Sequence, residues 1–172
     1  MSKKDPRDMI GYGSKDQKIK WPNNARIAVQ IVLNYEEGAE NCVLNGDNNS
    51  EIFLSEIIGA QPIKGRHINM ESLYEYGSRA GFWRLHKLFQ EKKIPITVFG
   101  VGMALEKNPE VCNAIIEANY EVASHGWRWI DYQNIKKTDE KKTVNYTHVK
   151  SPVFFYATFF RSSCGFNGSW TI

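Results

Sequence analysis

The run Ala-Arg-Ile-Ala-Val-Gln-Ile-Val-Leu-Asn-Tyr (residues 25–35) is the clearest structural signal in the sequence, and it is followed directly by Glu36 and Glu37. It is rich in β-branched residues and nearly uncharged, which predicts a buried strand. A second short run, residues 121–124, precedes His125 in the same way. Because parallel strands end at the same edge of a sheet or barrel, we expect the two carboxylates and the imidazole to converge on one cleft.

The segments between these two runs alternate between helix and strand patterns. Residues 94–101 predict another strand, with Pro95 at its start, where a missing N–H is tolerated. Apolar residues recur at helical spacing from 70 to 92, but two glycines weaken the first half, so we predict a helix over about 79–91. The order β–α–β–α–β with short links predicts an α/β chain with a parallel sheet or part of a barrel.

The triplet Asn108-Pro109-Glu110 predicts the start of a further helix. Asparagine is a good N-cap, proline suits the first helical position, and a carboxylate favours the first turn. The helix would end near Asn119. Its inward face would consist of Val111, Ala114, Ile115 and Ala118.

Composition narrows the class of protein. A length of 172 residues is enough for one domain with a core, and a net charge of +3 without a basic stripe argues against nucleic acid as a partner. The apolar stretch 153–160 is too short to span a bilayer, which predicts no membrane partner. Three widely spaced cysteines and the polar start argue against a disulfide framework and a secretory signal. We therefore expect a cytoplasmic protein.

Three segments lack a regular pattern. Residues 1–24 predict an irregular lead-in, and residues 38–70 predict a long loop that carries a helical turn. After Ile135 the chain becomes rich in lysine and then in aromatic residues, with neither a helical face nor a further βα unit. The sequence therefore divides into residues 1–135 and an unmatched tail, 136–172.

Glu36 and Glu37 are the first candidates for chemistry. Adjacent residues on an extended segment point to opposite sides, so one carboxylate can face a cleft while the other contacts backbone or a neighbour. A carboxylate in a water-poor cleft beside a like charge has a raised pKa and can act as a general base. The alternative is two solvated glutamates in a turn.

His125 and Arg79 are further candidates. His125 could polarise a carbonyl, act as a general acid or bind a metal, and the alternative is a structural or exposed histidine. A metal site would need a second ligand nearby, but Arg128 and Trp129 occupy the neighbouring positions. Arg79 lies near a predicted helix start and could recognise a planar polar group, or be solvated.

Several separate blocks of the sequence form one combined pattern. They are Asn34-Tyr35-Glu36-Glu37-Gly38, Asn69-Met70-Glu71-Ser72, the stretch from Tyr76-Gly77-Ser78-Arg79 to Leu85, Thr97-Val98-Phe99-Gly100, and the block from Ala123-Ser124-His125 to Trp129. Together they resemble the polysaccharide deacetylase superfamily, and within it the metal-independent allantoinase-like subgroup of urate catabolism. The resemblance covers about Arg7 to Ile135.

The resemblance implies a distorted (β/α) barrel, of which this chain would contain an incomplete part with about three βα units. Members usually hydrolyse N-acetyl groups with a metal held by an aspartate and two histidines. Glu36 and Glu37 stand at the positions of the family's paired aspartates, and His125 and Trp129 at those of its two histidines. An indole cannot ligate a metal, so the resemblance implies chemistry with no metal and no other cofactor.

The implied reaction is the hydrolytic opening of a cyclic amide, allantoin to allantoate. Glu36 or Glu37 would be the base and His125 the proton carrier or oxyanion donor, while Arg79 and Trp129 would shape the substrate pocket. The partner would be this small molecule, and self-association into a homo-oligomer is left open.

Two alternatives remain at this point. One is a metal-dependent deacetylase of amino sugars or peptidoglycan. The other is a non-catalytic remnant, because members are nearly twice this length and a barrel with three βα units cannot close. The tail 136–172 is expected to reflect a truncated or frameshifted product.

Overall fold

The computed structural model describes residues 7–15, 18–133 and 135–150. The chain forms two compact units, Met1–Gln30 and Ile31–Ile172, each considered by itself. In the first unit every described residue is exposed, and the regular structure of those residues is one short helical turn, η1 (Pro22–Asn24). This agrees with the irregular lead-in predicted for residues 1–24.

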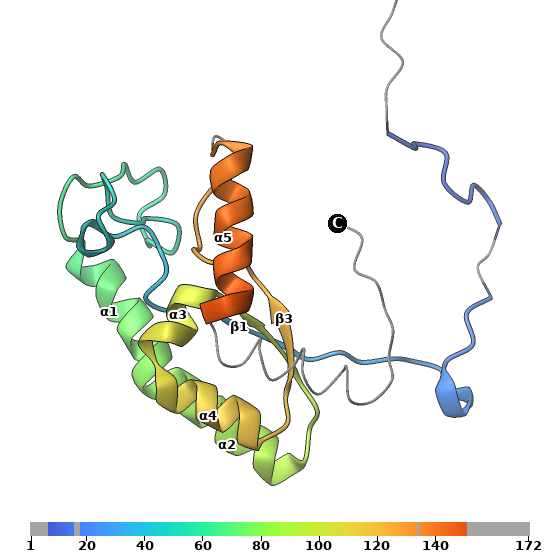
Figure 1. The fold of residues 1–172 in the computed structure, drawn as a ribbon. Coiled ribbons are helices and arrows are strands. Elements are labelled where there is room, and N and C mark those ends of the chain that lie inside the picture. Colours follow the sequence, from blue (N-terminus) through green and yellow to red (C-terminus); the bar gives the residue numbers. More distant parts are fainter. Residues whose placement is uncertain (1–6, 16–17, 134, 151–172) are drawn as a thin grey trace, which may run out of the picture. The chain divides into compact units, whose positions relative to one another are not determined.

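The second unit is built on a sheet of three parallel strands (Figure 1), β1 (Val32–Tyr35), β2 (Thr97–Gly100) and β3 (Glu121–Ser124), in the order β1-β2-β3. The strands end in register, because Tyr35 pairs with Gly100 and Gly100 with Ser124. The predicted α/β class with about three strand–helix units is confirmed.

The first strand is much shorter than predicted. It begins at Val32, so the prediction of a strand from residue 25 is wrong for residues 25–31. Val32 pairs with Thr97, the first residue of β2. Pro95 lies two residues before that point and has no N–H to offer, so β2 is not extended backwards to pair with a longer β1.

The helical region before β2 is longer than predicted. It runs from α1 (Ile68–Tyr76) through a π-helical turn, η3 (Gly77–Gly81), into α2 (Phe82–Lys92). The two glycines that weaken the sequence pattern lie at the ends of the π turn, so they widen the helix without ending it. The helix ends at Lys93, which adopts the left-handed conformation with φ 52°.

The signal at Asn108-Pro109 is confirmed. α4 spans Pro109–Glu117, and the Asn108 side chain accepts a hydrogen bond from the Val111 N–H. Asn119, the predicted stop, has a positive φ of 52° two residues after the helix ends. A short helix, α3 (Gly102–Lys107), also follows β2 directly. This helix has no recognisable signal in the sequence, because six residues show too little periodicity and its N-cap position is a valine.

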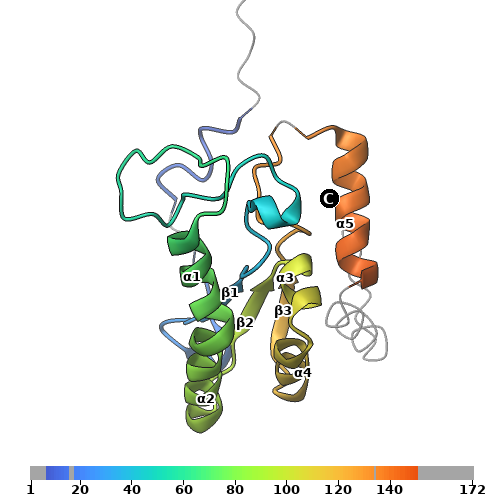
Figure 2. The same ribbon diagram turned by 90° about the vertical axis from the view of Figure 1, so that its left-hand side faces the viewer.

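The hydrophobic core lies between the sheet and the helices. Helices α2 and α4 cover one face of the sheet in both views (Figures 1 and 2). Val98 from β2, Leu105 from α3 and Ile115 from α4 are all 0% exposed. They belong to one cluster that also contains Tyr35 and Phe82. This cluster holds the strands in place, and therefore also the residues that directly follow the strand ends.

Two further segments of the second unit lie outside this core. The loop predicted over 38–70 carries the helical turn η2 (Val43–Asn45), as expected. Residues 137–150 form α5 (Lys137–Lys150), although the sequence shows no apolar helical face there. The predicted division at Ile135 stays a prediction, and the part of the tail from 151 to 172 lies outside the described residues. No helix in the described part of the chain is long and apolar enough to cross a membrane.

Candidate active site

Glu36 and His125 meet at the carboxyl edge of the sheet. Nε2 of His125 lies 2.9 Å from Oε1 of Glu36, and the amide of Asn34 donates to the same oxygen over 3.1 Å. A carboxylate accepts hydrogen bonds, so an Nε2–H of His125 can donate to Glu36 in this pair. The imidazole is the more accessible partner, with 36% of its side chain exposed against 17% for Glu36. This is a histidine oriented by a carboxylate.

The backbone brings these two side chains together. The ladder of the sheet continues past the strand ends, where Val101 N–H donates to the Tyr35 carbonyl and His125 N–H donates to the Gly100 carbonyl. Residues 36 and 125 therefore leave β1 and β3 at the same level, on either side of β2. The predicted convergence of a strand-end carboxylate and a strand-end imidazole is thus present for Glu36.

Glu37 turns to the other side and is partly buried. Its Oε2 accepts the N–H of Glu36 over 2.9 Å. Burial, more than the neighbouring Glu36 and Glu40 carboxylates, raises the pKa of Glu37 above its usual range, although its backbone hydrogen bonds oppose the shift. The structure therefore separates the two carboxylates: Glu36 contacts His125, and Glu37 fixes the backbone that carries Glu36.

Gly77 makes room for Glu37. A Cβ at this position would lie 2.3 Å from Oε1 of Glu37 and 2.7 Å from its Cγ. Such an approach is far closer than non-bonded atoms allow. The π turn lies beside the loop after β1, and its first residue is a glycine. Because glycine has no Cβ, the Glu37 carboxylate can pack against the helix backbone there.

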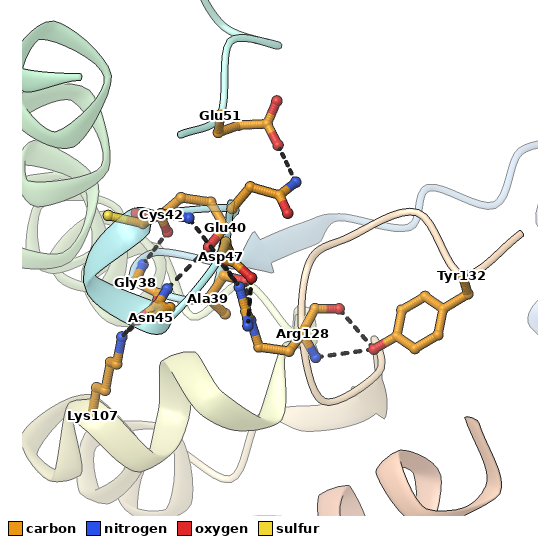
Figure 3. A network of polar contacts seen from close by, with 11 residues as sticks. Gly38, Ala39, Glu40, Cys42, Asn45, Asp47, Glu51, Lys107, Arg128 and Tyr132 are labelled. Atoms are coloured by element: carbon orange, nitrogen blue, oxygen red, sulfur yellow. Dashed lines mark hydrogen bonds and ion pairs between the residues drawn. The ribbon is translucent and has the colours of Figure 1, made fainter. Parts of the chain in front are cut away.

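Arg128 joins the two loops that carry the site (Figure 3). Its guanidinium donates to the carbonyl oxygens of Ala39 and Glu40, both over 3.0 Å, and to the Asp47 carboxylate. Its own backbone is held by Tyr132, whose hydroxyl accepts the Arg128 N–H and donates to the Arg128 carbonyl. We call Arg128, Asp47 and the carbonyl groups of Ala39 and Glu40 the arginine clamp.

Trp129 is positioned by the same two loops. Its backbone N–H donates to the Ala39 carbonyl over 3.0 Å. Its ring packs edge-on against Phe53, with 5.6 Å between ring centroids, and tilted against Tyr74, with 6.3 Å between centroids. Trp129 and His125 line one cavity of about 430 Å³ together with residues of the loop after β3 and of α5. The structure thus brings Glu36, His125 and Trp129 into one region.

Arg79 is not part of this region. Its guanidinium is paired with Glu75 one turn earlier, at 3.2 Å, and 77% of the side chain is exposed. It does not line the cavity that contains His125. Asn34, Gly77 and Arg128, in contrast, support the site although sequence analysis assigned them no such role. Only Asn34 carried a local signal, since it lies two residues before Glu36 on the strand.

Comparison with known proteins adds to this geometry. Residues 68–150 match the family described as polysaccharide deacetylase. A protein of Schizosaccharomyces pombe with the provisional name polysaccharide deacetylase is 44% identical over 151 residues, which are 86% of this chain and 45% of that protein. The chain therefore contains part of a polysaccharide deacetylase domain, over residues 68–150.

Two solved structures are similar to this chain in both sequence and fold. The crystal structure of Puue allantoinase is 52% identical, with a TM-score of 0.79, over 84% of this chain and 48% of that one. A provisionally named polysaccharide deacetylase from Pseudomonas aeruginosa is 55% identical, with a TM-score of 0.78, over 83% and 48%. The chain thus spans about half the length of these relatives.

A metal of the kind that polysaccharide deacetylases usually hold between an aspartate and two histidines does not fit these residues. Glu36 and His125 offer two donors, but the third position is the indole of Trp129, whose ring N–H has no lone pair for a metal. Within the described residues, no group of three or more His, Cys, Asp or Glu side chains is placed to hold a metal ion. The donor set is one that suits proton transfer.

The arginine clamp predicts that a lysine cannot replace Arg128 without a loss of stability. We expect Arg128→Lys to lower the free energy of unfolding by about 1–3 kcal/mol, because a single ammonium leaves some of three acceptors unpaired. The matched control is Arg79→Lys at an exposed ion pair, which should change it by less than about 0.5 kcal/mol. Urea unfolding followed by tryptophan fluorescence measures both. Equal effects would contradict the clamp.

The packing of Glu37 predicts opposite effects at two neighbouring glycines. Gly77→Ala should destabilise the protein by about 1–3 kcal/mol through steric conflict with Glu37. At Gly81 a Cβ would meet atoms no closer than 3.6 Å. Gly81→Ala should therefore stabilise the helix by up to about 1 kcal/mol. The same unfolding experiment decides, and a stabilising Gly77→Ala would show that Glu37 does not lie there.

The raised pKa of Glu37 predicts a pH-dependent difference between wild type and Glu37→Gln. Between the unfolded value near 4.5 and the raised folded value, the folded protein binds more protons, so the Glu37 contribution weakens as pH rises through that window. Near pH 4 the two melting temperatures should be similar. At pH 7 the variant should melt higher, by roughly 2 °C or more. A constant difference across this range would contradict the assignment.

Proposed function

We propose that the site hydrolyses a non-peptide C–N bond without a metal, and that its reaction is the opening of the cyclic amide allantoin to allantoate. The observation that supports this proposal is the Glu36–His125 pair, with an indole at the position where metal chemistry would need a second imidazole. The similarity to Puue allantoinase at 52% identity supports the choice of substrate.

The pair can carry out both proton transfers that the reaction needs. His125 takes a proton from water at Nδ1 while the water oxygen bonds to the ring carbonyl carbon. Glu36 accepts the Nε2–H and stabilises the positive charge that develops on the imidazole. The C–N bond then breaks, and His125 returns the proton to the leaving nitrogen. One water is consumed, and the products are a carboxylate and a ureido N–H.

Each remaining candidate residue then has a separate function. Glu37 holds the N–H of Glu36 and thus the loop geometry. Trp129 forms an apolar wall of the cavity that contains His125, which limits water around the reacting atoms. Arg79, exposed and paired with Glu75, has no contact with this region and is given no role in the reaction.

The test measures allantoin turnover by the full 172-residue chain after treatment with a chelator. We expect activity to survive the chelator, and His125→Ala and Glu36→Gln each to lower kcat/KM by about 10²-fold or more. Glu91→Gln, an exposed carboxylate of α2 paired with Lys87, is the control and should retain wild-type turnover.

Relatives named polysaccharide deacetylase make N-acetylated amino sugars the second substrate to assay. Release of acetate that requires an added divalent ion would reject the metal-free mechanism. Turnover of neither substrate by a chain that unfolds cooperatively would favour a non-catalytic role.

A further inference from the structure

The helix that runs from α1 through η3 into α2 carries four large apolar side chains that the fold leaves uncovered. Each is between 38% and 52% exposed, and none belongs to the core cluster or lines the cavity that contains His125. The four are Leu73, Tyr76, Leu85 and Leu88, and we call them the apolar flank. The proposed hydrolysis makes no use of them.

These four side chains lie on one side of the helix. Leu73 and Tyr76 are three residues apart, which makes them neighbours on a helix surface, and the same holds for the two leucines of α2. Arg84 bridges the π turn between the two pairs, because its Nη1 donates to the Tyr76 hydroxyl over 2.7 Å and its guanidinium lies 5.7 Å from the centre of the Tyr76 ring. Leu88 follows Arg84 by four residues and therefore lies on the same side.

The opposite side of the helix faces the end of α4. The ring of His86 and the amide of Gln90 both hydrogen-bond to the hydroxyl of Tyr120, which follows α4. Leu88 is two residues from each of them, which is a rotation of about 200° around the helix axis. The apolar flank therefore points away from α4.

The apolar flank is symmetric about the middle of the helix. Two of its residues stand seven and four positions before Ala80, and the other two stand four and seven positions after Gly81. A two-fold axis at this point places each half of the flank against the other half on a second copy. A two-fold interface must be complementary to itself, and this spacing meets that condition. The two residues beside the axis are small, so the helix backbones can approach each other closely there.

The charges along the helix favour a second copy in the antiparallel direction. Residues 68–80 carry a net charge of −1 and residues 81–93 a net charge of +3, with histidine counted as neutral. The contributing residues are Glu71, Glu75 and Arg79 in the first half and Arg84, Lys87, Glu91, Lys92 and Lys93 in the second half. An antiparallel pair places each negative half beside the positive half of the other copy, whereas a parallel pair would place like charges together.

We propose that the apolar flank is the interface of a homodimer, in which the helices of two copies pack antiparallel across a two-fold axis at Ala80–Gly81. Tyr76 then contacts Leu85 of the partner subunit, and Leu73 contacts Leu88 of the partner subunit. The helix is about 37 Å long, because each residue adds about 1.5 Å, so the contact is an extended one. The flank contains neither Glu36 nor His125, so this proposal does not depend on the proposed hydrolysis.

The experiment measures the mass of the full 172-residue chain by sedimentation velocity at concentrations up to about 100 µM. We expect a monomer–dimer equilibrium that reaches twice the monomer mass. Leu73→Glu and Leu88→Lys should each raise the dissociation constant about tenfold or more, because a two-fold interface then buries two unpaired charges. The control is Leu54→Lys in the loop before α1, where the leucine is 50% exposed against 48% for Leu73, and it should dimerise like wild type. A monomer at every concentration, or equal weakening by the control, would overturn the proposal.

The combination of Leu73→Glu with Leu88→Lys tests the pairing itself. Within one chain the two positions are about 22 Å apart along the helix, so the new charges do not contact each other there. In the proposed dimer each new carboxylate lies against a new ammonium of the partner, so the double variant should dimerise about fivefold or more tightly than either single variant. A double variant that dimerises no more tightly than the single variants would overturn the proposal.

Discussion

Everything at the candidate site depends on the register of three short parallel strands. Each strand has four residues, and their last residues, Tyr35, Gly100 and Ser124, pair side by side. The hydrogen bonds of Val101 and His125 continue this ladder by one residue. A shift of one residue in β1 would turn Glu36 away from His125 and direct Glu37 toward it, because successive side chains point to opposite sides. The chemistry of the site is therefore set by backbone pairing.

The arginine clamp holds together the two loops that follow β1 and β3. Loops are the most mobile parts of a fold, and the carboxylate and the imidazole both lie at the start of a loop. Arg128 lies in the loop after β3 and binds backbone carbonyls of the loop after β1. The backbone N–H of Trp129 donates a further hydrogen bond to the Ala39 carbonyl. Two segments almost 90 residues apart in sequence, around Glu40 and Arg128, are thereby fixed to each other.

The two adjacent glutamates illustrate how environment separates identical side chains. Both side chains are partly buried, but Glu36 contacts an imidazole, whereas Glu37 packs against the backbone of Gly77. The π turn at Gly77–Gly81 supplies the space for this, and π turns are frequent at functional sites. Glu37 thus acts on the site through the backbone, because it holds the N–H of Glu36 and with it the start of the loop after β1.

The sequence by itself determined the order of strands and helices, the start of α4 at Asn108-Pro109, and the convergence of Glu36 with His125, because these follow from local patterns and from the shared edge of parallel strands. Its resemblance to the polysaccharide deacetylases also implied that Trp129 stands at the position of a second histidine. Only the tertiary structure decided where β1 begins, which glutamate faces the histidine, and that Arg128 supports the site while Arg79 does not. These facts depend on contacts between residues distant in the chain, such as Glu37 with Gly77 and Arg128 with Asp47, and no periodicity or local propensity encodes them.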